Sequence, residues 1–237
     1  MDIQLPGIET ATQALETLGE GGWPMIPLAA CSLIAVTIIV ERAVALRRRA
    51  IIDADIVRAI DAYAGESSAQ HLLGLCGRAG GPLARIVEEV LDIRHLGPAQ
   101  IPETVYAAGR IQVSRLERGL TLLEIIAGVS PLIGLLGTVL GMLTVFNAIS
   151  AEGIGDPQVL SQGISKALIT TIAGLCVGIP ALAFHSWFTK RVDDLAAEMQ
   201  GHTTRLIVKL NGQDLQQTPD GAWGRGNQSA GGTPTSS

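Results

Sequence analysis

Residues 130–146 read SPLIGLLGTVLGMLTVF, a stretch with one proline, three glycines, two threonines and no charged residue. In water, each glycine inside a helix costs up to about 1 kcal/mol relative to alanine, and an interior proline costs about 3 kcal/mol. Inside a bilayer the same composition is common, because small residues let neighbouring helices approach closely. The stretch therefore predicts a membrane-spanning helix, and it decides the fold class.

The rest of the apolar composition is concentrated in the same way. Hydrophobic residues make up 47% of the 237-residue chain and charged residues 16%, and three apolar runs stand out at 24–40, 125–149 and 167–188. Each run approaches or exceeds the length of about 17 to 25 residues that a membrane helix needs. We predict an all-α membrane protein with three transmembrane helices and with long helices extending into the cytoplasm.

Basic residues predict the orientation of these helices. Eleven arginines lie between the first and second runs, and the tail adds five more Lys and Arg residues, whereas residues 1–23 contain none. Cytoplasmic flanks collect Lys and Arg, so the N-terminus is expected outside and the C-terminus inside, in a multi-pass protein of the bacterial inner membrane. Because a secretory signal peptide needs a basic N-terminal region, the first run is expected to be an uncleaved anchor.

The predicted organisation follows from these runs and from the spacing of apolar residues between them. Residues 53–64 and 82–93 have helical periodicity, and 102–123 is expected to form one helix that continues into the second membrane run. The expected segments are periplasmic 1–23, membrane helix 24–45, cytoplasmic helical region 46–120, membrane helix 121–149, periplasmic loop 150–165, membrane helix 166–188, cytoplasmic helix 189–210 and a disordered tail 211–237.

Small residues recur at helical spacing on the second and third runs. Two glycine pairs have GxxxG spacing, and each helix has a narrow face of small residues that carries a threonine; the residues are Gly134, Gly137, Thr138 and Gly141, then Thr171, Gly174 and Gly178. Such a face either packs closely against another helix or lines a narrow passage, and these residues alone favour plain packing. Pro131 and Pro180 are expected to kink the helices or to lie at a helix entry.

Charge is absent from the middle of all three runs. Intramembrane acids normally mark proton relays, so a titrating carboxylate would have to come from another chain if this one helps to conduct protons. His185 is expected to be an interfacial polar residue, and Lys166 is expected to reach the outer interface. A net charge of −5 gives no reason to expect nucleic-acid binding, and no metal motif, cofactor motif or catalytic motif is present.

Three stretches resemble the ExbB/TolQ/MotA proton-channel family. Residues 130–146 and 163–188 (GISKALITTIAGLCVGIPALAFHSWF) resemble its second and third membrane helices, and residues 21–49 resemble its first helix, with a Glu-Arg pair at the cytoplasmic boundary. With three membrane helices instead of four, the chain is similar to the ExbB and TolQ branch. The resemblance covers roughly residues 21–190.

The resemblance implies a proton-motive-force transducer without enzymatic activity. Family members form a pentameric ring in the lipid bilayer, and the ring surrounds single-pass helices of an ExbD- or TolR-like partner that carries one membrane aspartate. Thr138 and Thr171 match the pore-lining threonines that face this aspartate, and the five glycines match the closely packed pore wall. An ExbB-like chain would then drive a TonB-like protein for outer-membrane transport, and a TolQ-like chain would serve envelope integrity.

Two departures keep alternatives open. Lys166 stands where ExbB and TolQ proteins usually have a glutamate, and a cation at the periplasmic pore mouth would oppose proton entry unless Glu152 or Asp156 pairs with it. Leu140 replaces a common tryptophan. A non-conducting membrane scaffold with the same fold is therefore the alternative to a channel, and a membrane enzyme is disfavoured by the absence of catalytic motifs.

Overall fold

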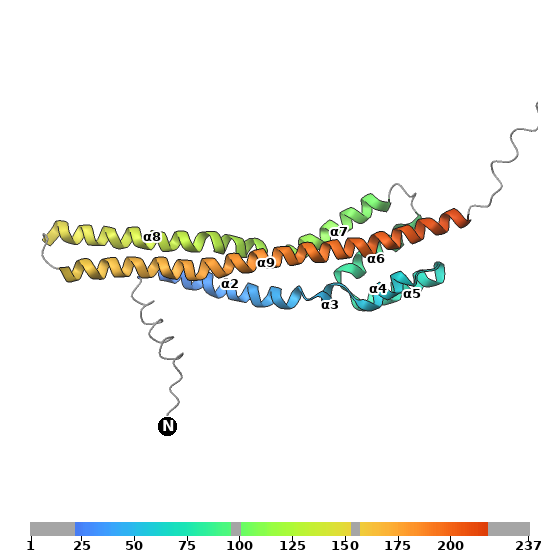
Figure 1. Cartoon of the computed structure of the whole chain (residues 1–237), viewed down its shortest axis with the longest axis horizontal. Helices are drawn as coiled ribbons and strands as arrows, with labels where there is room; N and C mark the ends of the chain where they lie inside the picture. Colours follow the sequence, from blue (N-terminus) through green and yellow to red (C-terminus); the bar gives the residue numbers. More distant parts are fainter. Residues whose placement is uncertain (1–21, 96–100, 153–156, 218–237) are drawn as a thin grey trace, which may run out of the picture. The chain divides into compact units, whose positions relative to one another are not determined.

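The computed structural model describes residues 22–95, 101–152 and 157–217, and all regular secondary structure in these ranges is helical (Figure 1). The elements are α2 Met25–Ala45, α3 Arg48–Ile51, α4 Ala54–Asp61, α5 Glu66–Ala79, α6 Pro82–Asp92, the 3-10 helix η1 Ile93–His95, α7 Ile101–Glu117, α8 Leu120–Glu152 and α9 Pro157–Gln217. The predicted periplasmic segment and most of the predicted disordered tail lie outside the described residues.

The chain divides into two compact units, which are described separately. Unit 1 comprises the residues up to Arg47 together with Val113–Asp194, and it contains α2, α8 and the first part of α9. Unit 2 comprises Arg48–Gln112 and the residues after Asp194, and it contains α3 to α6 and the last part of α9.

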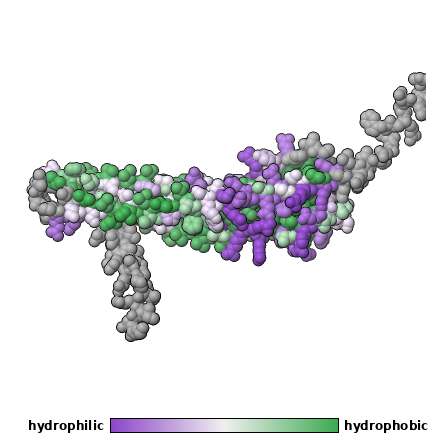
Figure 2. All heavy atoms as spheres, in the orientation of Figure 1, coloured by the Kyte–Doolittle hydropathy of each residue, from purple (hydrophilic) through white to green (hydrophobic). Residues whose placement is uncertain are grey.

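Unit 1 contains the three apolar helices. The candidate membrane spans are Met25–Ala45, Leu120–Asn147 and a window beginning at Ser161 in α9, each with a mean hydropathy of 2.0 or 2.1. Large apolar side chains point outward from all three, including Leu33 at 71% exposure and Leu132 and Ile179 at 63%. In Figure 2 the surface over α8 and the first part of α9 is mostly green, that is, hydrophobic. A surface of this kind is expected of helices that face lipid or other membrane helices, so the predicted fold class is confirmed.

The junction before α8 differs from the prediction. Residues 102–123 were expected to form one helix, but α7 ends at Glu117 and α8 begins at Leu120. Gly119 between them has φ +87°, which other residues adopt only with strain. The Arg42 side chain of α2 lies beside it and donates from Nη1 to the carbonyl oxygen of Leu116 at 3.3 Å. The glycine therefore ends the helix, and an arginine from α2 satisfies a carbonyl of the last turn of α7.

Unit 2 has an apolar core of its own. Helices α4 and α6 form where helical periodicity predicted them; the Asp53 carboxylate caps α4 by accepting a hydrogen bond from Asp55 N at 2.7 Å. The core is built by fully buried side chains of four helices, namely Ile56, Ile60, Leu72, Leu83, Leu91, Leu195, Met199 and Leu206. Helix α5 was not predicted, and α9 continues as a helix to Gln217, beyond Asn211, where the disordered tail was expected to begin.

Candidate functional site

Glycines bring the backbones of α8 and α9 together. A Cβ atom built on Gly134 would lie 2.9 Å from the carbonyl oxygen of Thr170 and 3.1 Å from Cα of Thr171. A Cβ atom on Gly174 would lie 2.6 Å from the carbonyl oxygen of Ser130. All three distances are shorter than an ordinary contact with Cβ. Only glycine fits at these two positions without moving the helices apart.

The same contact continues along both helices. A Cβ atom on Gly141 would lie 2.8 Å from Cβ of Ala167, and one on Gly178 would lie 2.7 Å from Cγ of Pro131. Gly137 packs directly on the Thr170 side chain. The five glycines singled out from the sequence therefore all lie at the contact between α8 and α9, and we call this contact the glycine interface.

Thr171 forms a hydrogen bond across the glycine interface. Its hydroxyl donates from Oγ1 to the carbonyl oxygen of Gly134 at 3.1 Å, and the side chain is half-buried. Because the acceptor lies on the other helix, this bond contributes to helix association, for which bonds in membrane proteins average about 0.6 kcal/mol. The hydroxyl oxygen keeps acceptor capacity for another group.

Thr138 is half-buried and makes a local hydrogen bond. Its Oγ1 donates to the carbonyl oxygen of Leu135, one turn earlier in α8, at 2.6 Å. This is the usual bond of a threonine inside a membrane helix. As with Thr171, the hydroxyl proton is directed to backbone and the oxygen can accept one more hydrogen bond, as from a protonated carboxylic acid.

Two further hydroxyls at this interface were not predicted. Thr170 is 1% exposed, and its Oγ1 donates to the carbonyl oxygen of Ala167 at 2.7 Å. Ser130 is fully buried, and its Oγ has no hydrogen-bond partner among the described residues. The signal in the sequence was the spacing of Ser130, Gly134, Gly137 and Gly141 at intervals of three or four residues, which places the serine on the glycine face.

The two prolines lie inside continuous helices. Pro131 is in the middle of α8 and Pro180 is within α9, so neither marks a helix entry. Pro131 also packs against Gly178 of α9, where the missing side chain leaves room for the ring. In this position the ring fills space in the glycine interface, besides removing one backbone donor from α8.

Lys166 lies near the start of the apolar part of α9, at the end of unit 1 that was predicted to face outside. Its side chain lies beside Gly22, just before α2, where a Cβ atom would be 2.9 Å from Lys166 Cε and 3.3 Å from Nζ. At 100° per residue, Lys166 is about 140° around the α9 axis from Thr171. Asp156 lies outside the described residues, and so does the side chain of Glu152, so the predicted ion pair is not observed.

One acidic and one basic group meet at the other end of the glycine interface. Nε2 of His185 lies 3.9 Å from Oε2 of Glu124, and the two side chains are 18% and 65% exposed. Glu124 is only four residues after the start of α8, and it falls at the edge of the predicted membrane helix. It was not predicted as part of the site because it immediately precedes the apolar run 125–149.

Carboxylates are absent from the part of this site that carries the threonines. Helix α8 has no Asp or Glu between Glu124 and Glu152, and α9 has none between Pro157 and Asp193. Within the described residues, no group of three His, Cys, Asp or Glu side chains is arranged to hold a metal ion. The site can supply hydroxyl groups and a close approach between helices, but it has no carboxylate beside the threonines.

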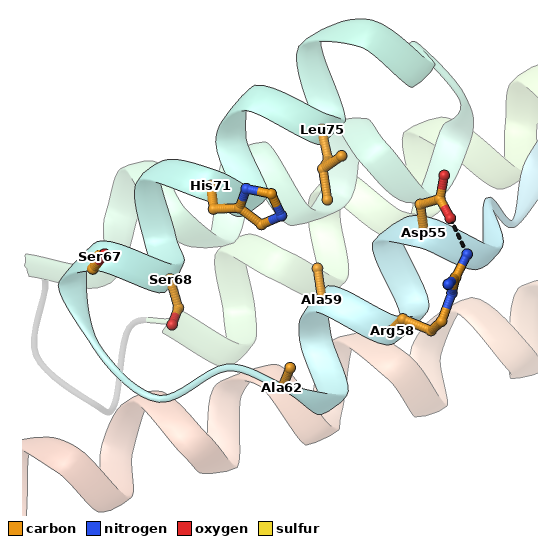
Figure 3. A pocket seen from close by; sticks show the side chains of 8 residues that line it. All are labelled: Asp55, Arg58, Ala59, Ala62, Ser67, Ser68, His71 and Leu75. Carbon is orange, nitrogen blue, oxygen red and sulfur yellow. Dashed lines mark hydrogen bonds and ion pairs between the residues drawn. The ribbon is translucent and has the colours of Figure 1, made fainter.

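Unit 2 contains a separate open pocket of about 500 Å³ between α4 and α5 (Figure 3). Its lining includes His71, Ser67 and Ser68, but Ser68 Oγ already accepts a hydrogen bond from Ala64 N at 3.3 Å. Across the pocket, Arg58 pairs with Asp55 of the same helix. The pocket is open to solvent, and its charged side chains Arg58 and Asp55 pair with each other. We therefore do not identify it as a binding site.

The sequence of this chain matches one family of known proteins. The model of the MotA/TolQ/ExbB proton channel family matches residues 79–201, which is more than half of the chain. A protein of Synechocystis named as ExbB-like 3 is 33% identical over 71% of this chain and 81% of its own length. An ExbB homologue of Methanothermobacter thermautotrophicus is 32% identical over 59% of this chain and 49% of its own length.

A second branch name occurs among the relatives. The Tol-Pal system protein TolQ of Haemophilus influenzae is 32% identical over 46% of this chain and 47% of its own length. The chain thus spans about half of the archaeal and Haemophilus proteins.

Proposed function

We propose that this chain, which belongs to the MotA/TolQ/ExbB proton channel family, is the ring-forming subunit of an inner-membrane complex that converts the proton-motive force into movement. The proposal rests on the glycine interface of α8 and α9. Two threonine hydroxyls lie at or beside this interface, and neither helix has a carboxylate next to them. Thr138 and Thr171 are the proposed proton-pathway residues.

A wall of this composition suits a carboxylate that arrives from a partner. In the structure both hydroxyl protons go to backbone carbonyls, so each oxygen is placed to accept a hydrogen bond from a protonated acid. A hydroxyl that rotates away from its carbonyl can instead donate to the ionised carboxylate, so the same group can serve both states of a titrating acid. We propose that the partner is a single-pass ExbD- or TolR-like protein with one membrane aspartate. The glycines close the contact between α8 and α9, which leaves a smooth wall that the partner helix can approach.

The outward-facing apolar side chains support assembly into a ring. On α8 they recur at helical spacing through Ile125, Val129, Leu132, Leu136, Val139 and Leu143, and α9 has a corresponding set. Lipid and neighbouring copies of the chain can both cover such a surface. We propose a homopentamer around the partner helices, in keeping with the resemblance of this chain to family members.

The downstream role is proposed as ExbB-like. In that role the complex drives a TonB-like protein and thereby TonB-dependent outer-membrane transport. The TolQ-like role in envelope integrity is the alternative within the same mechanism, and the relatives include both names.

Native mass spectrometry of the tagged protein, extracted gently from the membranes of its own organism, tests the proposal. We expect a five-fold ring that retains fewer copies of a small single-pass protein with one membrane aspartate. A ring without such a protein after several gentle extraction conditions would refute the proposed mechanism, because this chain has no carboxylate beside its threonines.

The second candidate function is a non-conducting scaffold, and Lys166 is the observation that favours it. A cation at the outer end of α9 disfavours proton entry, although its side chain lies on the α2 side, away from Thr171. The substitution K166E separates the two functions. A channel whose entrance is tuned by this charge should change its proton flux in proteoliposomes, whereas a scaffold should show no flux before or after the substitution.

A further inference from the structure

The pair of Glu124 and His185 lies on the same side of the α8–α9 pair as the proposed pathway threonines. Glu124, Pro131 and Thr138 are spaced by seven residues on α8, and Thr171, Gly178 and His185 are spaced by seven on α9. Seven residues are almost two helical turns, so each set forms one stripe along its helix.

Contacts join the two stripes in the middle and at one end. A Cβ atom on Gly178 would lie 2.7 Å from the ring of Pro131, in the middle of the stripes. Nε2 of His185 lies 3.9 Å from Oε2 of Glu124 at the end that the basic residues predict to be cytoplasmic. Along α8 the stripe extends about 21 Å from Thr138 to Glu124, at 1.5 Å per residue.

We propose that Glu124 and His185 form the proton-release site at the inner end of the conduction pathway, an inference that rests on the proposed function. The threonines act where the partner's carboxylate titrates, and the pair acts where the proton leaves the membrane. A chain of water molecules has to carry the proton from Thr138 to Glu124, because the distance of about 21 Å is too long for one direct proton transfer.

The proposed transfer is balanced and leaves the site unchanged. Neutral His185 takes up, on one ring nitrogen, a proton that pathway water relays from the partner's protonated carboxyl. One N–H bond forms as an O–H bond of the nearest water breaks; that water regains a proton along the water chain, and the partner's carboxyl is left as a carboxylate. The resulting imidazolium is stabilised by the ionised carboxylate of Glu124, and it then returns the proton to cytoplasmic water. Imidazole is suited to this step because one ring nitrogen can take up a proton while the other keeps its own.

The burial of the two groups fits their roles. His185 is mostly shielded from solvent, and its backbone carbonyl accepts a hydrogen bond from Thr189 Oγ1 at 2.9 Å, which belongs to the next turn of α9. Glu124 is exposed enough to reach water. Charged residues that flank this end in the sequence include Glu41 and Arg42 after the apolar part of α2, Glu117 and Arg118 before α8, and Lys190 and Arg191 on α9.

An ordinary interface ion pair is the alternative explanation, and a pH profile distinguishes it. The complex of this chain with its co-purifying partner is reconstituted into proteoliposomes with a pH-sensitive dye, and a potassium gradient with valinomycin drives proton flux. The pH of each side is varied separately. For the wild-type complex we expect flux to change in a single step with the pH of one side only, the side onto which the pair opens.

Substitution of either residue should remove this step. We expect H185Q and E124Q each to lower the flux at least about tenfold, since positioned acid–base groups contribute about 100-fold or more. The double variant should be no worse than either single variant, and E124D should retain most of the flux. The control variants H71Q and E103Q change the same residue types at exposed positions elsewhere and should conduct normally.

Native mass spectrometry shows whether each variant is assembled, and H185N replaces H185Q if the latter does not assemble. Unchanged flux and an unchanged pH step in assembled H185Q and E124Q complexes would overturn this inference and leave the proposed function standing. Absence of proton flux in the wild-type complex would overturn the proposed function and the inference with it.

Discussion

Substitution of Gly134 by alanine measures how much the glycine interface depends on backbone contact. The added Cβ atom would lie 2.9 Å from the carbonyl oxygen of Thr170 and within 3.2 Å of two Cα atoms of α9. These are backbone atoms, so they cannot rotate away as the end of a side chain can. To restore an ordinary contact near 3.4 Å, the two helices must separate by about half an ångström.

The expected cost is in the range of an overpacked core. Inserting one methyl group into a close-packed contact costs about 1–3 kcal/mol, and the separation also stretches the hydrogen bond from Thr171 Oγ1 to Gly134 O. Gly128 provides a matched control, because it lies on the same helix with nothing within 4 Å of a built Cβ atom. G128A should be neutral or stabilising by up to about 1 kcal/mol from helix propensity.

Unfolding of the complex by titration with denaturing detergent, followed by circular dichroism and by native mass spectrometry, compares the two variants. G134A should unfold at lower detergent content than the wild type, and G128A should not. Both variants replace glycine by alanine in α8. Equal stability of the two would therefore refute the argument that backbone atoms of α9 leave no room for a Cβ atom at Gly134.

Three further predictions follow from single contacts. T171V keeps the volume but loses the donor to Gly134 O, so it should lower proton flux while T171S retains it; equal flux in both would exclude a role for the hydroxyl. Burial raises the pKa of Cys76 to about 12, so a water-soluble maleimide at pH 7.5 should leave Cys76 unlabelled until unit 2 unfolds, and rapid labelling of the folded protein would contradict its burial. The hydrogen bond from Arg48 lowers the pKa of Glu198 below its ordinary 4.5, so the stabilisation of unit 2 is present above that pH and lost as the pH falls further. Hydrogen exchange of α3 and α9 should show this acid-dependent loss in the wild type and not in E198Q.

The membrane helices were predictable because hydropathy is a property of the chain alone. A charge-free run of sufficient length has few alternatives to a membrane helix, so α2 begins within one residue of the expected 24. The small residues of α8 and α9 were likewise predictable as a helix contact, because their spacing places them on one face. In both cases the information is local and periodic.

Some other features could not be predicted from the sequence, because each depends on a contact with a second element far away in the chain. The hydrogen bond that satisfies Leu116 O at the end of α7 comes from the Arg42 side chain, on a helix more than 70 residues earlier. Helix α5 carries Ala69, Leu72 and Cys76 at helical spacing, and all three are buried in unit 2, but the face is short and follows a polar first turn, so it was not singled out. The pairing of Glu124 with His185 was hidden because the register between α8 and α9 follows only from their contacts.

The glycine interface also bears on which part of the proposed complex moves. Gly134 and Gly174 face each other at backbone distance, and Pro131 fills the space left by Gly178, so sliding of α8 along α9 would bring backbone and ring atoms into collision. Packed contacts of this kind change between discrete arrangements and do not deform continuously. We therefore expect α8 and α9 to act as one rigid wall during the cycle, with movement taking place between this wall and the partner helix. In the proposed function, the threonine oxygens then keep fixed positions while the partner's carboxylate passes them, and only the O–H bond has to rotate to change from accepting to donating.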